Sequence, residues 1–405
     1  MRMAVINQPL GNRGDEAAHK AFIRTLSRTF PGSRIDIIFL HPDETLIDSI
    51  RVDAENVFYV NIPCLRWYRR FEQLGILLDT FAVSYMIPAL RKFRTLLRTY
   101  DKVICAPGGI CMGGFSNWEH IWQLDVARRL KVPVLYWGRS IGPFSNTSFL
   151  KRLFAKRSLR LLKYFSYTSL RDSVSLGIAR QLGIKADGVV DSAFLECPCA
   201  DVPGAIVNDM QGSDYAVFVP NSLTWHPRYS DIPQERIDRF YLEIIKLIEK
   251  KCAAQKIIML PQTYGTAVKD WAYFVRLKDA SRSKNIIVID ENQSSDVQQA
   301  IIRDAAFVIG ARYHSVVFAI NNQVPFISLS YEHKMKGLLE ALGMTDRMVE
   351  IQDIFDDGRN SKGAIQDTGI LLETLQKPAA DEARQIASQG FDRFKHSLSE
   401  GKCMQ

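Results

Sequence analysis

The strongest constraint on the fold is a regular alternation of short β-rich runs with segments of helical period. Parallel strands cannot be joined by a hairpin turn, so strands that alternate with helices connect through right-handed crossovers. The sequence therefore predicts an α/β fold built on parallel sheets. In the first half of the chain the predicted strands are Met3–Asn7, Arg34–Leu40, Val57–Val60, Lys102–Ala106, Pro133–Trp137 and Phe165–Leu170.

The same alternation begins again in the second half. An irregular stretch that contains Cys, Pro and Gly follows Leu195 and runs to Gly212, which is typical of a linker. A chain of 405 residues suits two domains, each with its own core. The predicted strands after the linker are Tyr215–Pro220, Lys256–Leu260, Ile286–Ile289, Ala306–Ile309 and Pro325–Leu329.

We therefore expect a Rossmann-like N-terminal domain at residues 1–205 and a second Rossmann-like domain at residues 206–375. A final helix over Glu382–Leu398 lies within residues 376–405 and is a candidate to cross back to the first domain. Two such lobes are expected to face a cleft lined by the carboxyl ends of the strands, where parallel sheets bind their ligands.

Charge and cysteine usage narrow the class of protein. A net charge of +8 and an isoelectric point near 9.0 favour anionic partners. Nucleic acid is not expected, because helix-turn-helix, zinc-finger and RNP motifs are missing. Seven scattered cysteines without a signal peptide predict a cytoplasmic protein. Cys197 and Cys199 lack a second pair at zinc-site spacing, so no metal site is expected.

One segment suggests contact with a membrane. Leu74–Leu90 is the most apolar long stretch, but it carries Asp79 and is shorter than the roughly 20 residues of a spanning helix. The wider segment Leu65–Arg94 combines basic and aromatic residues around this apolar centre. Peripheral contact with anionic lipid at the inner face of the membrane is one interpretation. A helix packed on its own domain, with a solvated basic face, is the other.

The turn Gly310–Ser315 is the sharpest candidate for chemistry. It follows a predicted strand and precedes the helical run Val316–Asn321. A helix N-terminus offers free N–H groups and partial positive charge, to which Arg312 and His314 would add, so the turn predicts an anion site. The alternative is a packing glycine, a solvated arginine and a structural histidine.

Two further cations follow strands. Arg171 precedes a helix that Asp172 or Ser173 would cap. It would point into the cleft or, alternatively, form a salt bridge with Asp172 or Asp191. Lys334 follows the strand that ends at Leu329 and adds a cation to the same rim.

Glycine-rich loops follow three strands of the first half. They are Gly11–Asp15, Pro107–Gly109 and Gly138–Pro143, and they allow tight, exposed backbone at the cleft. None fits the Walker or the GxGxxG pattern, so nucleotide phosphate binding is not indicated. The first loop also reads as a simple capped turn.

These motifs, in this order and over most of the chain, resemble the polysaccharide pyruvyl transferase family. The resemblance implies a two-lobed fold like that of GT-B glycosyltransferases, with an acceptor-side N-terminal domain and a donor-side C-terminal domain. It implies phosphoenolpyruvate as donor, a pyruvate ketal on a glycan as product, and neither metal nor cofactor. Ile110 stands where many relatives carry a glycine, and Asn221 or Ser222 where many carry a basic residue.

Phosphoenolpyruvate carries a phosphate and a carboxylate, which a planar guanidinium binds better than an ammonium. We predict Arg171 and Arg312 as clamps and His314 as the acid that protonates the vinyl methylene. Asp15 or Asp191 is a candidate base. The predicted substrate-binding residues are Asn12, Gly14, Asp15, Gly108, Gly109, Arg139, Asp191, Gly310, Tyr331 and Lys334.

Two other functions fit the same architecture. A sugar-nucleotide glycosyltransferase would use Gln262 and Asp290-Glu291 as ribose contacts. A catalytically silent scaffold of a polysaccharide-assembly complex is the third candidate. The sequence identifies neither the acceptor sugar nor whether it is lipid-linked.

Overall fold

The computed structural model describes residues 1–40, 43–63, 76, 87–210, 214–251, 256–264, 269–352, 354–355 and 362–400. The chain divides into two compact units. Unit 1 comprises Met1–Leu10, Ala18–Leu195 and Gln385–Gln405, and unit 2 comprises Gly11–Ala17 and Glu196–Arg384. The division after Leu195 falls ten residues before the boundary expected at 205, and a short N-terminal segment is assigned to the second unit.

Unit 1 is built on a parallel sheet in the order β3-β2-β1-β4-β6-β7-β8, with β5 paired to β6. The six strands predicted for this half are confirmed, and β5 and β8 are additional. The bounds are β1 Arg2–Ile6, β2 Arg34–Leu40, β3 Val57–Ile62, β4 Lys102–Cys105, β5 Gly108–Met112, β6 Val134–Ile141, β7 Tyr167–Leu170 and β8 Asp187–Gly188.

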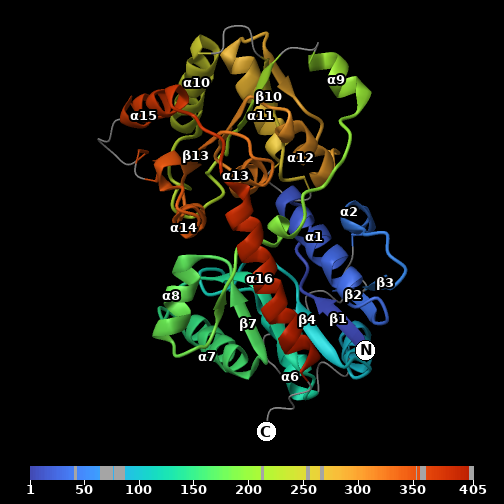
Figure 1. The fold of residues 1–405 in the computed structure, drawn as a ribbon. Coiled ribbons are helices and arrows are strands. Elements are labelled where there is room, and N and C mark those ends of the chain that lie inside the picture. The colour runs from blue at the N-terminus through green and yellow to red at the C-terminus, as the bar shows by residue number, and fades with distance from the viewer. Residues whose placement is uncertain are drawn as a thin grey trace. The chain divides into compact units, whose positions relative to one another are not determined.

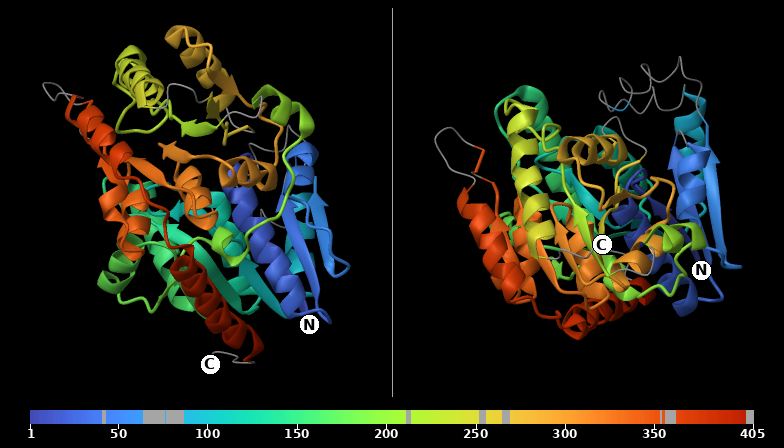
Figure 2. Two further views of the ribbon diagram at one scale, coloured as in Figure 1. Left: turned by 45° about the horizontal axis from the view of Figure 1, so that its top comes forward. Right: turned by 90° about the horizontal axis from the view of Figure 1, so that it is seen from above.

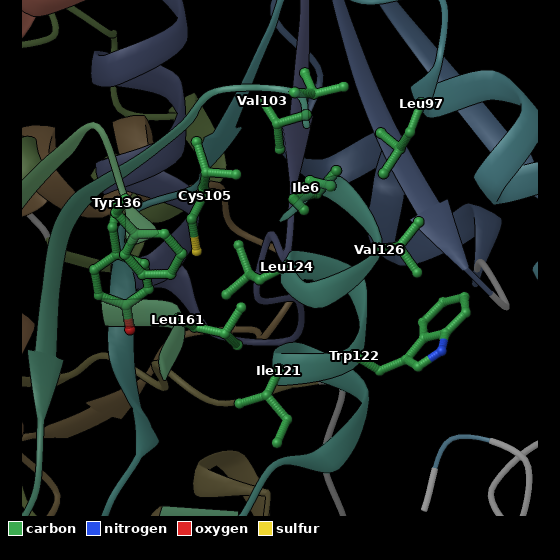
Figure 3. Packing of buried hydrophobic residues seen from close by; sticks show 14 of the residues in the cluster. Ile6, Leu97, Val103, Cys105, Ile121, Trp122, Leu124, Val126, Tyr136 and Leu161 are labelled. Atoms are coloured by element: carbon green, nitrogen blue, oxygen red, sulfur yellow. The ribbon is translucent and has the colours of Figure 1, made fainter. Parts of the chain in front are cut away.

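The sheet of unit 1 has a hydrophobic core on each face, because alternate strand residues point to opposite sides. Ala4, Cys105 and Tyr136 belong to one core, together with Ile121 and Leu124 of α6; Figure 3 shows these α6 side chains pointing toward the strands. The helices of unit 1 are α1 Arg13–Thr29, whose first turn belongs to unit 2, α2 Glu44–Ile50, α5 Pro88–Leu97, α6 Trp118–Arg129, α7 Phe149–Tyr164 and α8 Ser173–Gln181.

The last helix, α16 (Ala380–Ser399), contributes to the other core of unit 1. Phe394 contacts Trp137 of β6 at 4.9 Å between ring centroids and Phe22 of α1 at 5.6 Å. Figures 1 and 2 show α16 beside α1, lying across the strands. The C-terminal end of the chain therefore completes the N-terminal sheet.

Unit 2 is built on a six-stranded parallel sheet in the order β11-β10-β9-β12-β13-β14. Its strands are β9 Tyr215–Val219, β10 Lys256–Met259, β11 Ile286–Val288, β12 Phe307–Gly310, β13 Phe326–Ser330 and β14 Met348–Glu350. Its helices are α9 Gly204–Met210, α10 Gln234–Lys251, α11 Asp270–Ser281, α12 Ser295–Arg303, α13 Tyr313–Asn321, α14 His333–Ala341 and α15 Lys362–Glu373. All nine residues of α13 are buried.

Both sheets reverse their strand order at one point: between β1 and β4 in unit 1, and between β9 and β12 in unit 2. Crevices at such switch points are the usual ligand sites of open α/β sheets. A residue with positive φ follows the first strand of each pair, Asn7 (62°) and Leu223 (60°). Left-handed backbone is uncommon for residues other than glycine and often marks a functional site.

The sequence also made predictions about a membrane-contact segment, membrane-spanning helices and metal sites. Within Leu65–Arg94, residues 65–75 and 77–86 lie outside the described residues. Among those that are described, no helix is long and apolar enough to cross a membrane. Across the same residues, no cluster of His, Cys, Asp or Glu is arranged to hold a metal ion. Cys197 and Cys199 are exposed and not bonded to each other.

Candidate functional site

The predicted site residues fall into two sets, one in each unit. Unit 2 holds Asn12, Gly14, Asp15, Gly310, Arg312, His314, Tyr331 and Lys334, and unit 1 holds Gly108, Gly109, Arg139, Arg171 and Asp191. Asn12, Gly14 and Asp15 precede the first strand of unit 2 by about two hundred residues, yet they belong to the same unit as Arg312 and His314.

The turn after β12 leads directly into α13. Gly310 is its packing residue, because a Cβ there would lie 2.2 Å from the Ser315 hydroxyl. Arg312 is the N-cap residue of α13, and its carbonyl accepts hydrogen bonds from the amide and the hydroxyl of Ser315. The positive end of the α13 dipole and the Arg312 guanidinium therefore lie at the switch point of this sheet.

Asp270, the first residue of α11, holds Arg312 in place. One carboxylate oxygen of Asp270 accepts a hydrogen bond from Arg312 Nη2, and the other accepts the backbone N–H groups of Gln262 and Thr263, both at 3.0 Å. Burial lowers the pKa of Arg312, but the Asp270 carboxylate outweighs burial and leaves that pKa above its usual value. Arg312 is therefore a fixed, charged group.

Three buried donors at this switch point have no hydrogen-bond partner among the described residues: Arg312 Nε, Gln262 Nε2 and Asn221 Nδ2. They follow β12, β10 and β9, which are neighbours in the sheet. Asn221 is fixed in this orientation, because its Oδ1 accepts the Leu223 amide at 3.2 Å and Trp225 Nε1 at 2.9 Å. Buried donors are nearly always satisfied in native proteins, by protein groups, water or a ligand, so these three are available to acceptor oxygens.

His314 packs against the N-terminal segment. A Cβ on Gly14 would lie only 1.7 Å from His314 Nδ1, so the backbone of Gly14 touches the imidazole ring. Asn12 caps this turn, with its side-chain oxygen accepting the Gly14 amide at 2.8 Å. The capped turn that the sequence left open is therefore present. It gives Gly14 a specific task, which is to let the backbone approach His314.

The remaining predicted residues of unit 2 are less available to a ligand. Lys334 pairs with Glu332 at 2.6 Å, and although burial raises the Glu332 pKa, Lys334 outweighs it and lowers that pKa. Tyr331 is buried, which raises its pKa far above the usual value, and its carbonyl accepts the Tyr229 hydroxyl at 2.7 Å. Asp15 is partly exposed in the first turn of α1.

In unit 1, Arg171 forms a buried ion pair with Asp191 at 2.5 Å and donates to the Ser140 hydroxyl at 3.3 Å. This is the salt bridge that the sequence left open. Asp191 also accepts the Ala193 amide at 3.0 Å, and Asp172 is the N-cap of α8, as one of the two candidates. A role for Arg171 as a donor clamp stays a prediction.

Arg139 fills the switch point of unit 1. Its side chain is fully buried and donates to the carbonyl of Ala106 at 2.9 Å and to that of Asn7 at 3.2 Å, and its Nη1 lies 3.2 Å from His120 Nδ1. Burial, followed by the charge of Arg139, lowers the His120 pKa well below its usual value.

The two glycines of the neighbouring loop differ in their surroundings. A Cβ on Gly108 would lie 2.7 Å from Arg139 Nη2, whereas a Cβ on Gly109 would meet open space. The other loop glycines are packing residues, since a Cβ on Gly113 would lie 2.1 Å from the Gly142 carbonyl. Close packing therefore explains Gly108, Gly113 and Gly142, and nothing in the structure requires a glycine at position 109.

Comparison with known proteins shows the family of this chain. The family model described as polysaccharide pyruvyl transferase matches residues 12–333. The chain belongs to the polysaccharide pyruvyl transferase family. It is also similar to the amylovoran biosynthesis protein AmsJ of Erwinia amylovora, with 23% identity over 379 residues, which cover 87% of this chain and 89% of AmsJ.

Solved structures show how far the likeness extends to the fold. The UDP-GlcNAc 2-epimerase of Methanocaldococcus jannaschii has a TM-score of 0.59 and 15% identity, covering 98% of this chain and all of that one. A UGT transferase from Siraitia grosvenorii has a TM-score of 0.56 and 10% identity, covering 99% and 96%. The predicted GT-B-like α/β fold is confirmed. At these identities the likeness extends to the fold alone.

Sequence reasoning missed the residues that hold the N-terminal segment of this pyruvyl transferase family member in unit 2. Arg13 pairs with Glu16 at 2.6 Å and donates to the Glu291 carbonyl at 2.6 Å. Glu16 is fully buried and accepts the Ser295 amide at 2.9 Å, at the start of α12. The only sequence signal is the spacing of Arg13 and Glu16, which is equally typical of an exposed helical pair.

Asp270 was also missed, and no local signal identifies it. It opens a helix, where acidic residues are common because they favour the positive helix end. Its partner Arg312 lies 42 residues away in sequence. Trp225 shows the same limit: its ring centroid lies 5.8 Å from the Arg312 guanidinium carbon, a contact that only the folded sheet creates.

Proposed function

We propose that this protein transfers a pyruvyl group from phosphoenolpyruvate to two hydroxyl groups of one sugar. The product is a pyruvate ketal on an exopolysaccharide or cell-wall glycan, and inorganic phosphate is released. The observation that carries the proposal is the set of unsatisfied buried donors at the switch point of unit 2, next to Arg312 and beneath the α13 N-terminus.

The charge and shape of phosphoenolpyruvate fit these donors. Its phosphate and carboxylate present five unsubstituted oxygens on a small three-carbon frame, which suits a compact set of N–H donors better than a large ligand. Asp270 occupies one nitrogen of Arg312 and leaves Nε for the donor substrate. A fixed guanidinium binds such an anion with little loss of side-chain entropy.

His314 lies two residues after Arg312, in the first turn of α13. In the proposed mechanism its imidazolium protonates the methylene carbon of the donor, and the second carbon becomes an oxocarbenium-like centre. The first sugar hydroxyl adds there and gives up its proton. The bond between that carbon and the phosphate oxygen then breaks, and phosphate leaves with the electron pair.

The second hydroxyl of the same sugar adds to the carbon that phosphate has left and loses its proton. One of the two released protons restores the imidazolium, and the other leaves with phosphate or solvent, so the reaction consumes no cofactor. Asp15 and Asp191 remain candidate bases, and Arg171 remains a candidate second clamp. Localisation in the cytoplasm likewise remains a prediction.

The alternative, a sugar-nucleotide glycosyltransferase, has weaker support. Of its candidate ribose contacts, Glu291 pairs with Lys269 at 3.1 Å, and its carbonyl accepts a hydrogen bond from Arg13. Gln262 keeps an unsatisfied donor, but this donor can bind a phosphate or carboxylate oxygen as well as a ribose hydroxyl. The family match is to pyruvyl transferases and therefore favours pyruvyl transfer over the alternative, whereas the amylovoran relative concerns polysaccharide biosynthesis in general.

Calorimetry separates them. We expect phosphoenolpyruvate to bind in the presence of a chelator and inorganic phosphate to compete with it, while UDP-glucose and UDP-N-acetylglucosamine do not bind. Mass spectrometry of a glycan acceptor after turnover should show the mass of one pyruvyl ketal, with equimolar phosphate released. Binding of a sugar nucleotide without any binding of phosphoenolpyruvate would overturn the proposal.

A further inference from the structure

Helix α7 carries an unusual concentration of positive charge on the surface of unit 1. Its sixteen residues, Phe149–Tyr164, include six Lys or Arg and no Asp or Glu. Figure 1 shows α7 in this unit. A helix with one sign of charge repels itself, so such a run is uncommon without a partner of opposite charge.

The positive residues form one exposed stripe. Arg152, Lys156, Arg160 and Lys163 are all exposed and follow one another at spacings of four, four and three residues, which places them on one helical face. The opposite face packs on the core through Phe154, Ala155, Ser158, Leu161 and Leu162. The stripe is therefore fixed in direction by the fold.

Little of the charge of this stripe is neutralised by described carboxylates. Of its four residues, Arg160 lies 3.7 Å from Asp125 of α6. Asp125 is already paired at 2.6 Å with Arg128 and with Arg129. Asp125 is therefore shared among three arginines, and Lys156 and Lys163 pair with no described carboxylate.

Apolar side chains are exposed at the N-terminal end of the same helix. Phe149 is 69% exposed and Leu150 is 48% exposed. Phe115 is 49% exposed and follows Gly114. The Gly114 amide donates a hydrogen bond of 2.9 Å to the carbonyl of Pro143, which lies in the loop that precedes α7. We call these apolar residues and the four basic residues of the stripe the α7 surface.

We propose that the α7 surface docks on an anionic lipid bilayer. The stripe matches a layer of negatively charged headgroups, and the apolar side chains at its end match the boundary of the acyl chains just beneath. A soluble polyanion such as an acidic glycan would engage the charge but would give exposed Phe149 and Leu150 nothing to bury them. The bilayer is therefore the partner that accounts for both parts of the surface.

This proposal does not rest on the proposed pyruvyl transfer, because bilayer binding needs no substrate. The two meet if the acceptor sugar is lipid-linked, since docking would then hold the enzyme at the surface that carries its acceptor. The predicted contact through Leu65–Arg94 is a separate prediction.

The test is cosedimentation of the full-length protein with vesicles at low salt. We expect binding to an equal mixture of phosphatidylcholine and phosphatidylglycerol, weak binding to phosphatidylcholine alone, and release as salt screens the attraction. The variant Lys156→Glu/Lys163→Glu should lower partitioning about 30-fold or more, since each basic residue near an anionic surface contributes roughly a factor of five.

The matched control is Arg239→Glu/Lys250→Glu on α10 of unit 2. Both control residues are exposed, and the pair changes net charge by the same amount. We expect the control to bind vesicles much more tightly than the α7 variant. Equal loss in both variants would show that net charge alone drives binding and would overturn the assignment to α7.

A second variant distinguishes a bilayer from a soluble polyanion. Phe149→Ser removes the most exposed aromatic side chain without changing charge, and should lower partitioning into mixed vesicles about tenfold, because burial of one Phe side chain is lost. Circular dichroism and thermal unfolding would show that the variant folds. Unchanged vesicle binding by Phe149→Ser, or no binding of the wild-type protein to mixed vesicles at low salt, would overturn the bilayer proposal.

Discussion

The switch points of the two units share a topology and differ in what fills them. In unit 1 the crevice between β1 and β4 is occupied by Arg139, which donates to the carbonyls of Asn7 and Ala106. In unit 2 the crevice between β9 and β12 is bordered by Arg312, which keeps one nitrogen unsatisfied. One arginine is used by the fold, whereas the other retains capacity for a ligand.

This difference teaches how to separate a structural arginine from a binding arginine in a parallel sheet. Both side chains are buried, and both follow glycine-containing motifs, so neither burial nor the motif decides. The number of unsatisfied donors distinguishes the two arginines. Arg312, Gln262 and Asn221 each keep a buried donor without a partner, which is rare in a protein interior. This contrast supports the proposal that the donor substrate binds in unit 2.

His314→Gln tests the chemistry assigned to unit 2 and should have the largest effect. Gln keeps a polar side chain of similar reach but cannot deliver a proton as an acid. Turnover should fall on the order of 10²- to 10⁴-fold, the range for loss of a general acid, with donor affinity largely kept. Single-turnover phosphate release and calorimetry of phosphoenolpyruvate measure the two quantities.

Near-normal phosphate release by His314→Gln with saturating acceptor would remove the acid assignment. A loss confined to donor affinity would instead make His314 a binding residue. Either result would be compatible with the proposed donor site in unit 2 but would change its chemistry.

Arg139→Met tests whether the arginine of unit 1 is structural. Removing it leaves the buried carbonyl of Ala106 and the partly buried carbonyl of Asn7 without this donor. Each buried acceptor that loses its partner costs about 1–3 kcal/mol, so the free energy of unfolding should fall by about 3 kcal/mol. Chemical denaturation measures the loss. If the folded variant instead loses affinity for phosphoenolpyruvate with its stability unchanged, the contrast between the units is wrong.

Gly14→Ala tests the contact between the N-terminal segment and His314. The added methyl group would overlap the imidazole ring, at 1.7 Å from Nδ1, so the ring or the segment must shift. A misplacement of about 1 Å in a reacting group can lower turnover on the order of 10²-fold. We expect that loss in kcat, with donor affinity changed little.

Gly363→Ala is the matched control for this substitution. Gly363 lies in α15 of the same unit, is exposed, and has no atom within 4 Å of an added Cβ. It should leave turnover unchanged. If Gly14→Ala retains wild-type kcat, the segment does not position His314.

Arg312→Lys keeps the charge of the proposed clamp and removes its planar fork. Lys cannot meet Asp270 and the donor substrate at the same time with fixed geometry, so donor affinity and phosphate departure should both weaken. Loss of one charge-assisted hydrogen bond corresponds to about ten- to a hundredfold in affinity. Calorimetry on folded protein tests this, and unchanged affinity would mean that Arg312 is not the clamp.

Much of the fold was predictable because it depends on local pattern. Buried parallel strands are nearly continuous apolar runs, and ten of the eleven predicted strands begin within one residue of the observed start. β7, at Tyr167, begins two residues late. The strands that were missed lack that pattern: β5 opens with two glycines, and β8 and β14 have two and three residues. Glycine weakens a strand signal, and very short edge strands leave almost none.

The candidate site was predictable only where it is contiguous in sequence. The turn Gly310–Ser315 could be recognised because an apolar strand precedes it, a glycine opens it and a helix follows it. Asp270 reaches Arg312 through the sheet order, which no local pattern encodes. Asn221 and Trp225 bond to each other within one loop, but Trp225 also lies beside Arg312 through the folded sheet alone. The segment Gly11–Ala17 belongs to unit 2 through buried polar contacts of Arg13 and Glu16, and buried charges defy the rule that charged residues lie outside.

Gln262→Met should have the smallest effects, raising stability without ligand and lowering affinity for phosphoenolpyruvate. Gln262→Met replaces the side chain by one of similar length and removes the unsatisfied Nε2 donor. The backbone contacts of residue 262, with the Asp270 carboxylate and the Arg13 amide, do not involve the side chain and should persist. Without ligand the variant should be more stable by about 1 kcal/mol, because a buried donor that lacks a partner destabilises the fold. Affinity for phosphoenolpyruvate should fall about tenfold, since one hydrogen bond to a charged oxygen is lost. Thermal unfolding with and without phosphoenolpyruvate measures both effects in one experiment. A variant that loses stability without ligand and binds phosphoenolpyruvate as tightly as the wild type would show that Gln262 serves the fold of unit 2, as Arg139 serves that of unit 1.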